Sequence, residues 1–456
     1  MPSDSQNQSQ SLGSDPIGRL LVRLSLPATV AMIVNGLYNL VDTIFIGRGV
    51  GTEAIGGLAL AFPIQMLAMA FGMAIGQGAA SVISRALGAQ NREKASLGAG
   101  NAVTLALLVG IIILILGLSF MRPLLQLLGA SEVLEVYARQ YLTVILGGSP
   151  FLLMAMVANN VLRAEGKARI SMNIIALGAI LNILLDPLFI FVLDMGVAGA
   201  AWATILGQFA SFLYALSFYR KGRAEVQIQL HHLQPQRALI KEISLLGLPS
   251  LVRQSGQSFV TIMVNNLLGL YGGDVYISAY GVVNRLMMFL FMPLFGTVQG
   301  FQPIAGFNYG ARLYHRVKKT VWLATLYATS YTTMGFLLLF LAPRFFLGIF
   351  TKDFLLIETG EHVLRLAILA FPLVGVQVIG GTYFQVVGKS VPSLILNISR
   401  QFLILIPALL ILPPLWGLNG LLLCFPLSDA LAFFITATWF FVEILRLGKT
   451  QKSVRG

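Results

Sequence analysis

Apolar residues fill most of the chain in long runs, and short segments rich in charge, glycine or proline separate these runs. Several runs exceed about 18 residues, the length at which an apolar helix can cross the hydrocarbon core of a bilayer. This pattern predicts twelve membrane-spanning helices. They fall at about residues 24–46, 54–83, 99–120, 137–162, 171–193 and 196–218, and then at 245–271, 275–305, 321–341, 363–387, 391–412 and 418–445.

The composition supports a membrane protein. Apolar residues make up 57% of the chain and charged residues 11%, less than half of the share that is usual in soluble domains. The mean hydropathy is +0.81. So few charges cannot cover a soluble globule of this size, so we predict an all-α polytopic membrane protein that packs against the lipid bilayer.

The basic residues are unevenly distributed along the chain. Lys and Arg number 31 against 18 Asp and Glu, which gives a formal net charge of +13. If both termini are cytoplasmic, most of the Lys and Arg residues lie in cytoplasmic segments, as the positive-inside rule requires. Membrane topology therefore explains the net charge, and we expect no nucleic-acid partner.

The two halves of the chain are repeats. A shift of 222 residues aligns the following pairs: Leu26-Pro27 with Leu248-Pro249, Gly47 with Gly269, Gly51 with Gly273, Gln77-Gly78 with Gln299-Gly300, Gly88-Ala89 with Gly310-Ala311, and Gly166-Lys167 with Gly388-Lys389. Each half has an even number of spans, so both halves enter the membrane from the same side. Parallel repeats of this kind predict two pseudo-symmetric six-helix lobes, an architecture typical of transporters.

The repeat also predicts how the chain is divided. We expect a disordered polar N-terminus at 1–18 and an N-terminal lobe of six helices at 19–218. A basic cytoplasmic linker at 219–244 would lead to a C-terminal lobe of six helices at 245–445 and a cytoplasmic tail at 446–456.

The connection between the second and third predicted spans carries a glycine-rich motif that returns in the second half. The motif residues are Gly76-Gln77-Gly78-Ala79-Ala80 with Ser84-Arg85-Ala86-Leu87-Gly88-Ala89, and then Gln299-Gly300-Phe301-Gln302-Pro303 with Gly306-Phe307-Asn308-Tyr309-Gly310-Ala311. Together with the twelve spans, they resemble the MATE (multidrug and toxic compound extrusion) family over essentially the whole chain. The resemblance implies a monomeric exporter of amphipathic, often cationic, drugs in a bacterial cytoplasmic membrane, driven by protons or sodium ions.

Polar side chains gather on single faces of several predicted helices in the first half. Asn35, Tyr38, Asn39 and Asp42 share one face of the first helix, because they stand at positions i, i+3, i+4 and i+7. A carboxylate inside a membrane span is costly and marks a functional site by default. We therefore predict that Asn35, Tyr38 and Asn39 line a substrate cavity, and we add Asn159 from the fourth span.

A second acid, Asp186, follows Asn182 by one helical turn on the fifth span, and Thr204 lies on the sixth. The MATE resemblance implies a proton or cation site at Asp42, Asn182, Asp186 and Thr204, with the proton, or alternatively sodium, as coupling ion and no other cofactor. Two carboxylates that lie close together at low dielectric cannot both stay ionised, so such a pair can carry a proton. The alternative interpretation is that these acids only connect helices through hydrogen bonds.

Pro27 lies on the same helix as Asp42, and its missing backbone N–H makes it a candidate hinge. If protonation of Asp42 changes the packing of the first helix, a break at Pro27 lowers the cost of the movement. Most prolines in membrane helices are only tolerated kinks, and that interpretation stays open.

The second half has different intramembrane charges. Val264 and, after a one-residue slip, Pro407 align with Asp42 and Asp186, so coupling chemistry is predicted in one lobe only. The second half contains Arg253, Arg285 and Arg400 with Asp429. An ion pair between Arg400 and Asp429 that locks the last two helices is the favoured interpretation, while the roles of all four residues stay open. Because acids expected in the seventh and tenth helices of the sodium-coupled NorM-like branch are absent, the resemblance favours the DinF-like branch.

Other functions remain as alternatives. The arginines keep open a flippase for lipid-linked saccharide precursors, and a sodium-coupled drug antiporter is also possible in principle. An intramembrane aspartyl protease would use Asp42 and Asp186 as a dyad, but neither span has the Gly-x-Gly-Asp context of such enzymes, so we predict no enzyme. The single Cys424 allows no disulfide within the chain, and the four histidines fall in loops or at helix ends, so we predict no metal site.

Overall fold

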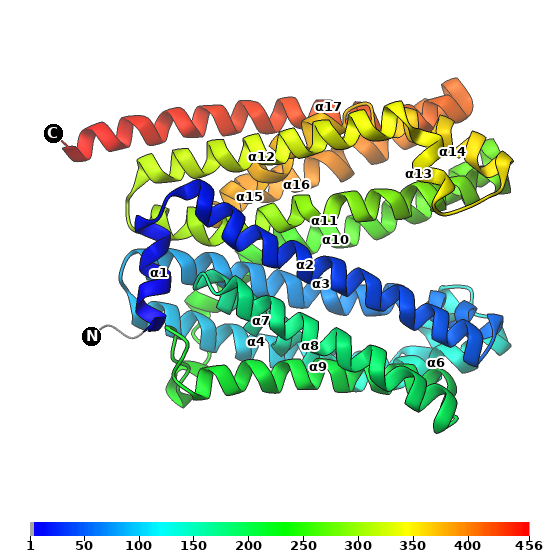
Figure 1. Ribbon diagram of the computed structural model, residues 1–456, viewed down its shortest axis with the longest axis horizontal. Helices are drawn as coiled ribbons and strands as arrows, with labels where there is room; N and C mark the ends of the chain where they lie inside the picture. Colours follow the sequence, from blue (N-terminus) through cyan, green and yellow to red (C-terminus); the bar gives the residue numbers. More distant parts are fainter. Residues whose placement is uncertain (1–3, 456) are drawn as a thin grey trace. The chain divides into compact units, whose positions relative to one another are not determined.

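The computed structural model describes the backbone of residues 4–455 and the side chains of residues 9–51 and 53–447. Every regular element in these residues is a helix, and Figure 1 shows the helices joined by short connections. The first half contains α1 (Asp4–Ser14), α2 (Ile17–Gly49), α3 (Thr52–Gly88), α4 (Arg92–Ser119), α5 (Met121–Leu127), α6 (Glu132–Gly147), α7 (Ser149–Ala164), α8 (Ala168–Pro187), the π-helix η1 (Leu188–Val192) and α9 (Gly196–Arg220). The second half contains the 3-10 helix η2 (Leu230–Leu233), α10 (Arg237–Gly272), α11 (Asp274–Gly310), α12 (Tyr314–Leu341), α13 (Pro343–Gly348), α14 (Phe354–Ala367), α15 (Phe371–Val386), α16 (Ser390–Ile398), the π-helix η3 (Ser399–Leu405) and α17 (Ile406–Arg455).

The predicted all-α membrane architecture is confirmed. Eight helical stretches are long and apolar enough to cross a membrane, and two bent pairs of helices raise the number to ten. One of these stretches, Ser390–Leu447, contains two predicted spans, because the backbone of Gly417 (φ 57°, ψ −139°) interrupts the helix between them. The remaining predicted span, 245–271, lies within α10. All twelve predicted ranges are therefore helical.

Two of the predicted spans are bent. The span predicted at 137–162 breaks between α6 and α7 with an angle of 53°, and the span at 363–387 breaks between α14 and α15 with an angle of 52°. Pro150 and Pro372 stand in the first turn of the second helix in each pair. A proline cannot donate to the preceding turn and its ring clashes there, so the first helix must end and a new helix begins.

The internal repeat recurs in the backbone. The helices α3, α4, α6, α7 and α8 begin 222 residues before α11, α12, α14, α15 and α16, respectively. The left-handed glycines recur with the same spacing: Gly51 and Gly273 have φ 120° and 75°, and Gly166 and Gly388 have φ 81° and 87°. The shift read from scattered glycines and prolines thus describes the spacing of whole helices.

Contacts between residues divide the chain into two units. The N-terminal unit comprises Met1–Ser14 and Val30–Leu251, and the C-terminal unit comprises Asp15–Thr29 and Val252–Gly456. This division differs from the predicted lobes at 19–218 and 245–445, because α2 and α10 each contribute to both units. The pattern of apolar residues could not reveal this exchange, since it shows that a helix is buried but not what covers it.

Glycines explain why the first parts of α2 and α10 pack as they do. Within the N-terminal unit, Gly78 of α3 lies against the backbone of Ile243 and Gly247, and a Cβ at Gly78 would clash with both. Within the C-terminal unit, Gly300, its equivalent in the repeat, lies in the same way against Ser25 of α2. The motif glycines therefore allow close contact between helices in each unit.

Two predicted segments outside the lobes are helical. The N-terminus, predicted as disordered at 1–18, contains α1 and the start of α2. Leu12 of α1 is 1% exposed and packs near Gly166, so one apolar residue in a polar sequence anchors the segment. At the other end, α17 continues through the predicted tail as far as Arg455.

The predicted linker at 219–244 docks on the N-terminal unit. The side chain of Asn101 on α4 donates to His232 O at 3.3 Å and accepts from the backbone N–H of Gln236 at 2.6 Å. Directly after the end of α7, the carboxylate of Glu165 accepts from the backbone N–H of Glu225 at 2.9 Å and pairs with Lys167 at 3.0 Å. Polar contacts therefore fix a segment whose sequence alone is typical of a loose connection.

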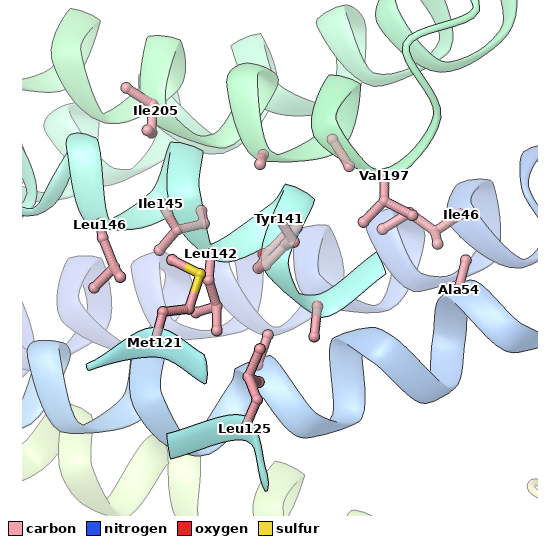
Figure 2. Packing of buried hydrophobic residues seen from close by; sticks show 14 of the residues in the cluster. Ile46, Ala54, Met121, Leu125, Tyr141, Leu142, Ile145, Leu146, Val197 and Ile205 are labelled. Atoms are coloured by element: carbon pink, nitrogen blue, oxygen red, sulfur yellow. The ribbon is translucent and has the colours of Figure 1, made fainter. Parts of the chain in front are cut away.

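A cluster of buried apolar residues holds the end of α2 in the N-terminal unit (Figure 2). Ile46, one turn after Asp42, is fully buried and belongs to this cluster together with Leu142 of α6 and Val197 of α9. Tyr141 lies in the same cluster and is 4% exposed. This packing fixes the part of α2 that carries Asp42.

Candidate functional site

Four of the predicted site residues lie together in the N-terminal unit. Asp42 of α2, Asn182 and Asp186 of α8, and Thr204 of α9 are all at most 6% exposed. Asn182 donates to Thr204 Oγ1 at 3.1 Å and to Asp186 Oδ1 at 3.4 Å. The carboxyl groups of Asp42 and Asp186 lie within hydrogen-bonding reach of each other. We call these four residues the Asp42 cluster.

The Asp42 cluster has more acceptor atoms than donors. Among the residues with described side chains, Asp42 Oδ1, Asn182 Oδ1 and Asp186 Oδ2 are buried and have no hydrogen-bond partner. Leaving such atoms unpaired is costly. A proton on one carboxyl group, or a hard cation that prefers oxygen ligands, would satisfy them. The set of side chains present therefore fits either coupling ion.

Small residues bring α8 and α9 close enough to form this cluster. Gly178 and Gly207 face each other, and a Cβ on Gly207 would clash with the carbonyl of Gly178. A Cβ on Gly207 would also lie 3.6 Å from the Cβ of Asn182. Because Thr204 precedes Gly207 by almost one turn, this close contact places its hydroxyl beside the Asn182 amide.

The helix changes its geometry next to Asp186. Pro187 follows directly and cannot donate a backbone hydrogen bond, and the chain continues as the π-helix η1. Short π-helical stretches frequently occur at functional sites. Asp186 is therefore held at the junction of two helical geometries.

The predicted cavity residues separate into two groups. Tyr38 lies close enough to Asp42 and Asp186 to interact with both, and it also contacts the side chain of Asn39. Asn39 donates to Asn35 O at 2.8 Å, one turn back along α2. Asn159, by contrast, is near the end of α7, where it donates to Ser171 O at 2.8 Å and accepts from Arg163 at 2.9 Å. The structure thus places Asn159 in a separate polar cluster.

Tyr141 and Gln65 were not predicted from the sequence as site residues. The Tyr141 side chain on α6 lies near Tyr38, Asp42 and Asp186, and its hydroxyl donates to Gln65 Oε1 of α3 at 3.4 Å. Both residues fall inside apolar runs, so the only sequence feature that marks them as site residues is a polar group within a span. They extend the polar surroundings of Asp42 to α3 and α6.

Comparison with known proteins identifies the family. The family model MatE matches residues 27–188 and 249–411, one block in each repeat. The chain belongs to the MATE family. The multidrug export protein MepA of Staphylococcus aureus (strain N315) is 26% identical over 416 residues, which cover 91% of this chain and 92% of that protein. MepA of Staphylococcus haemolyticus (strain JCSC1435) is 26% identical over 419 residues, 92% of each chain.

Solved structures of MATE proteins have the same fold. The outward-facing conformation of a multidrug resistance MATE family transporter matches with a TM-score of 0.90 at 28% identity, over 97% of this chain and 99% of that one. A MATE protein in a bent conformation matches with a TM-score of 0.92 at 29% identity, over 97% and 98%. The two-lobe architecture predicted from the repeat is therefore confirmed. The protein is a multi-pass membrane protein of a transporter family.

The C-terminal unit of this MATE protein contains the predicted ion pair. Arg400 Nε donates to Asp429 Oδ1 at 2.5 Å, and Gln377 donates to the carbonyl oxygen of Asp429 at 2.5 Å. Val264, which the repeat aligns with Asp42, is fully buried. Arg253 lies over the ring of Phe295, 5.9 Å from its centroid. The C-terminal unit therefore has no carboxylate at the α10 position that the repeat aligns with Asp42.

Glu93 of α4 lies beside His231 and His232 of the docked linker, and the possible ligand atoms of these three residues lie within 4.8 Å of one another. His232 Nδ1 accepts from the backbone N–H of Gln229 at 3.0 Å. In the neutral ring this bond assigns the proton to Nε2, which faces Glu93 Oε1 at 3.3 Å. A metal ligand needs a free ring nitrogen, so this arrangement favours a hydrogen bond between His232 and Glu93 over a metal site.

Proposed function

We propose that this MATE protein is a multidrug efflux transporter that exports amphipathic, cationic compounds by proton-coupled antiport. The observation that carries the proposal is the Asp42 cluster, with two carboxyl groups in reach of each other and three unpaired acceptor oxygens in one unit. The similarity to MepA proteins, which are named for multidrug export, supports the class of substrate.

The chemistry of exchange follows from charge. When a proton occupies the Asp42 cluster, the neutralised carboxyl gives a hydrogen bond to an oxygen that is otherwise unpaired. When that proton leaves, the cluster gains a negative charge that a cationic substrate can neutralise. Proton and substrate thus compete for one charge, which is the requirement for antiport. Sodium is the alternative coupling ion, because carboxylate, amide and hydroxyl oxygens also suit a hard cation.

Alternating access needs a helix that responds to the proton. Asp42 shares α2 with Pro27, and the chain passes from the C-terminal to the N-terminal unit between Thr29 and Val30. Pro27 lacks a backbone donor, so α2 bends there at lower cost than an unbroken helix. Reversing a two-state population from 1% to 99% takes about 5.5 kcal/mol. We propose Pro27 as the hinge, with a monomer as the working unit and both termini in the cytoplasm of a bacterium.

Export should be measured in proteoliposomes with an imposed pH gradient or an imposed sodium gradient. We expect Asp42→Asn to reduce export to background, because the amide keeps the shape and some hydrogen bonding but cannot exchange a proton. Asp194→Asn is the matched control, since Asp194 is an exposed acid in the same unit, and asparagine tolerates its φ of 51°. Full export by a folded Asp42→Asn protein would exclude the coupling role.

The two gradients separate the coupling ions. Export driven by the pH gradient alone supports the proton, and export driven only by sodium supports the alternative. A flippase for lipid-linked saccharide precursors is the second candidate function, favoured by Arg253 and Arg285, which form no ion pair with the side chains that the structure describes. It predicts lipid transfer without drug export in the same vesicles.

A further inference from the structure

Two arginines of the C-terminal unit carry charges that none of the described acidic side chains neutralises. Among the residues whose side chains the structure describes, neither Arg253 nor Arg285 forms a hydrogen bond or an ion pair. Arg253 lies on α10, about 12 Å inside the predicted span at 245–271, at roughly 1.5 Å per residue. An unneutralised guanidinium group this deep in a span is costly unless it faces water or a ligand.

The buried carboxylates of this unit, Asp429 and Glu443, are already paired. Asp429 pairs with Arg400 of η3, and Arg400 lies about as far inside its predicted span as Arg253 does. Glu443 pairs with Lys389, and Glu361 pairs with Arg344 and Arg365. The cation–π contact of Arg253 with Phe295 at 5.9 Å offsets only a small part of the cost of desolvation. The positive charge of Arg253 is therefore available to a ligand.

The surroundings of Arg253 combine polar and aromatic groups. Gly256, one turn further on the same face of α10, packs against the side chains of Gln401 and Phe402 of η3. Gln401 Oε1 is buried without a hydrogen-bond partner, so it is an acceptor that a ligand hydroxyl or amide can satisfy. The π-helical geometry of η3 is of the kind that often marks functional sites. The guanidinium and the two phenyl rings suit a molecule with an acidic group and an apolar body.

We propose that the C-terminal unit contains a binding site for the anionic group, a carboxylate or a phosphate, of an amphipathic ligand, and that Arg253 binds this group. The inference rests on the proposed export function in one respect, namely that such a ligand is transported. A planar guanidinium binds carboxylate and phosphate oxygens through two parallel hydrogen bonds. Arg285, exposed on α11 about 16 Å from the start of that helix, adds a second positive charge to the same unit.

Binding to the purified protein in a non-ionic detergent tests the site without any gradient. The probes are pyrenebutyrate and pyrenebutyl-trimethylammonium, which share the apolar body and differ in the sign of the charge. We expect Arg253→Gln to weaken pyrenebutyrate binding about ten- to hundredfold, as expected for the loss of hydrogen bonds to a charged group. Arg253→Lys keeps the charge but loses the planar fork, so its loss should be smaller. Binding of the cationic probe should not weaken in either variant.

Arg344→Gln is the matched control. Arg344 belongs to the same unit, is exposed, and lies in the short helix α13 outside the predicted spans. It should bind pyrenebutyrate like the parent protein. All variants must elute as a single species and melt at similar temperatures, which separates loss of the site from loss of the fold. Equal binding of pyrenebutyrate by the parent protein and Arg253→Gln would overturn the proposal.

A competition experiment identifies the source of the anion. Dioctanoyl phosphatidic acid and inorganic phosphate are added separately to the complex with pyrenebutyrate. Displacement by the lipid alone supports a lipid phosphate as ligand, and displacement by both supports a free phosphate group. Displacement by neither, with Arg253-dependent binding of pyrenebutyrate, supports a carboxylate. Asp42→Asn should bind pyrenebutyrate like the parent protein, so failure of the coupling proposal would leave this test intact.

Discussion

The two units share one backbone plan but differ in their buried chemistry. In the N-terminal unit, Asp42 and Asp186 lie together with unpaired oxygens around them. In the C-terminal unit, Val264 replaces Asp42 in the repeat, and the charges within the predicted spans include Arg253, Arg285 and the Arg400–Asp429 pair. The positions that recur at a spacing of 222 are glycines, prolines and helix ends. Backbone geometry was thus retained in both copies, while the side chains that carry charge were free to diverge.

The turns at Gly166-Lys167 and Gly388-Lys389 show this divergence at one position. Both glycines are left-handed, and each lysine is the N-cap residue directly before the next helix. Lys167 pairs with Glu165, two residues before it, and the side chains of this pair are 2% and 0% exposed. Lys389 pairs with Glu443 of the distant helix α17, and its side chain is 39% exposed. Of these two equivalent lysines, Lys167 therefore stabilises a local turn in its unit, and Lys389 stabilises a contact between helices in the other.

The largest stability effect is expected at the ion pair of the C-terminal unit. Arg400→Leu leaves Asp429 buried without a partner and should cost about 3–5 kcal/mol. Arg400→Leu with Asp429→Leu should recover most of this loss, because both charges are then absent. Asp42→Asn in the N-terminal unit should leave stability nearly unchanged. Thermal unfolding in detergent measures all three, and a stable Arg400→Leu protein would show that this pair is not structural.

A smaller difference is expected between the two lysines. Lys167→Gln should cost about 3 kcal/mol, because Glu165 is left buried and unpaired. Lys389→Gln should cost about 1 kcal/mol or less, because Lys389 lies outside the predicted spans, where its exposed side chain meets water, whereas Arg400 lies within a predicted span. Equal losses in thermal unfolding would contradict the contrast drawn between these turns.

The Lys167→Gln loss should also depend on pH. Burial raises the pKa of the Glu165 carboxyl above its ordinary value, although Lys167 and two backbone N–H groups act in the opposite direction. A group with a raised pKa in the folded state contributes most stability at low pH, and this contribution is lost as the pH rises through that pKa. The destabilisation by Lys167→Gln should therefore shrink as the pH is lowered, because Glu165 can then take up a proton. A loss that is constant with pH would count against this cause.

Thr204→Val tests the Asp42 cluster more gently. Valine keeps the shape but removes the hydroxyl that accepts from Asn182 at 3.1 Å. The expected cost is about 1 kcal/mol, which corresponds to about a fivefold lower affinity for the coupling ion. Thr204→Ser retains the hydroxyl and should transport normally. Transport rates across a series of imposed gradients would show the shift, and identical curves for valine and serine would remove Thr204 from the site.

The smallest effect on stability is expected at the prolines. Pro27→Ala should change the melting temperature little but should abolish the pH-dependent change in distance between α2 and α8. Spin labels at Leu37 and Ile180, both exposed within the N-terminal unit, would report this distance by electron paramagnetic resonance. Pro249→Ala, the equivalent change on α10, is the control and should preserve the shift. A shift that persists in Pro27→Ala would exclude the hinge while leaving Asp42 untouched.

Much of the fold could be predicted because its signals are local. Apolar run length marks each span, and the repeat is visible because Gly51, Gly166 and their counterparts must adopt backbone conformations that few other residues tolerate. The meeting of Asp42 with Asp186 was predicted from intramembrane charge and the family resemblance. Its geometry depends on Gly178 and Gly207, whose close contact no periodicity reveals.

Other features depend on partners far along the chain. Tyr141 faces the Asp42 cluster only because α6 packs against α2 and α3, and nothing in its own sequence neighbourhood marks that position. Leu12 orders a polar N-terminus by packing near Gly166, more than a hundred residues away. Asn159, predicted for the cavity, forms hydrogen bonds with Arg163 and Ser171. Such contacts cannot be read from the sequence, because tertiary packing and not local preference decides them.

The exchange of helix segments between the units sets an order for biogenesis. The N-terminal unit is incomplete until Leu251 has been synthesised, although its sixth predicted span ends near residue 218. Asp15–Thr29, among the first residues to leave the ribosome, must await the unit that begins again at Val252. Helices can therefore enter the membrane one after another, but neither unit can finish assembling from its own half of the gene. Two polypeptides separated within residues 221–229 would each carry a segment that belongs to the other, so they should become stable only when they are produced together.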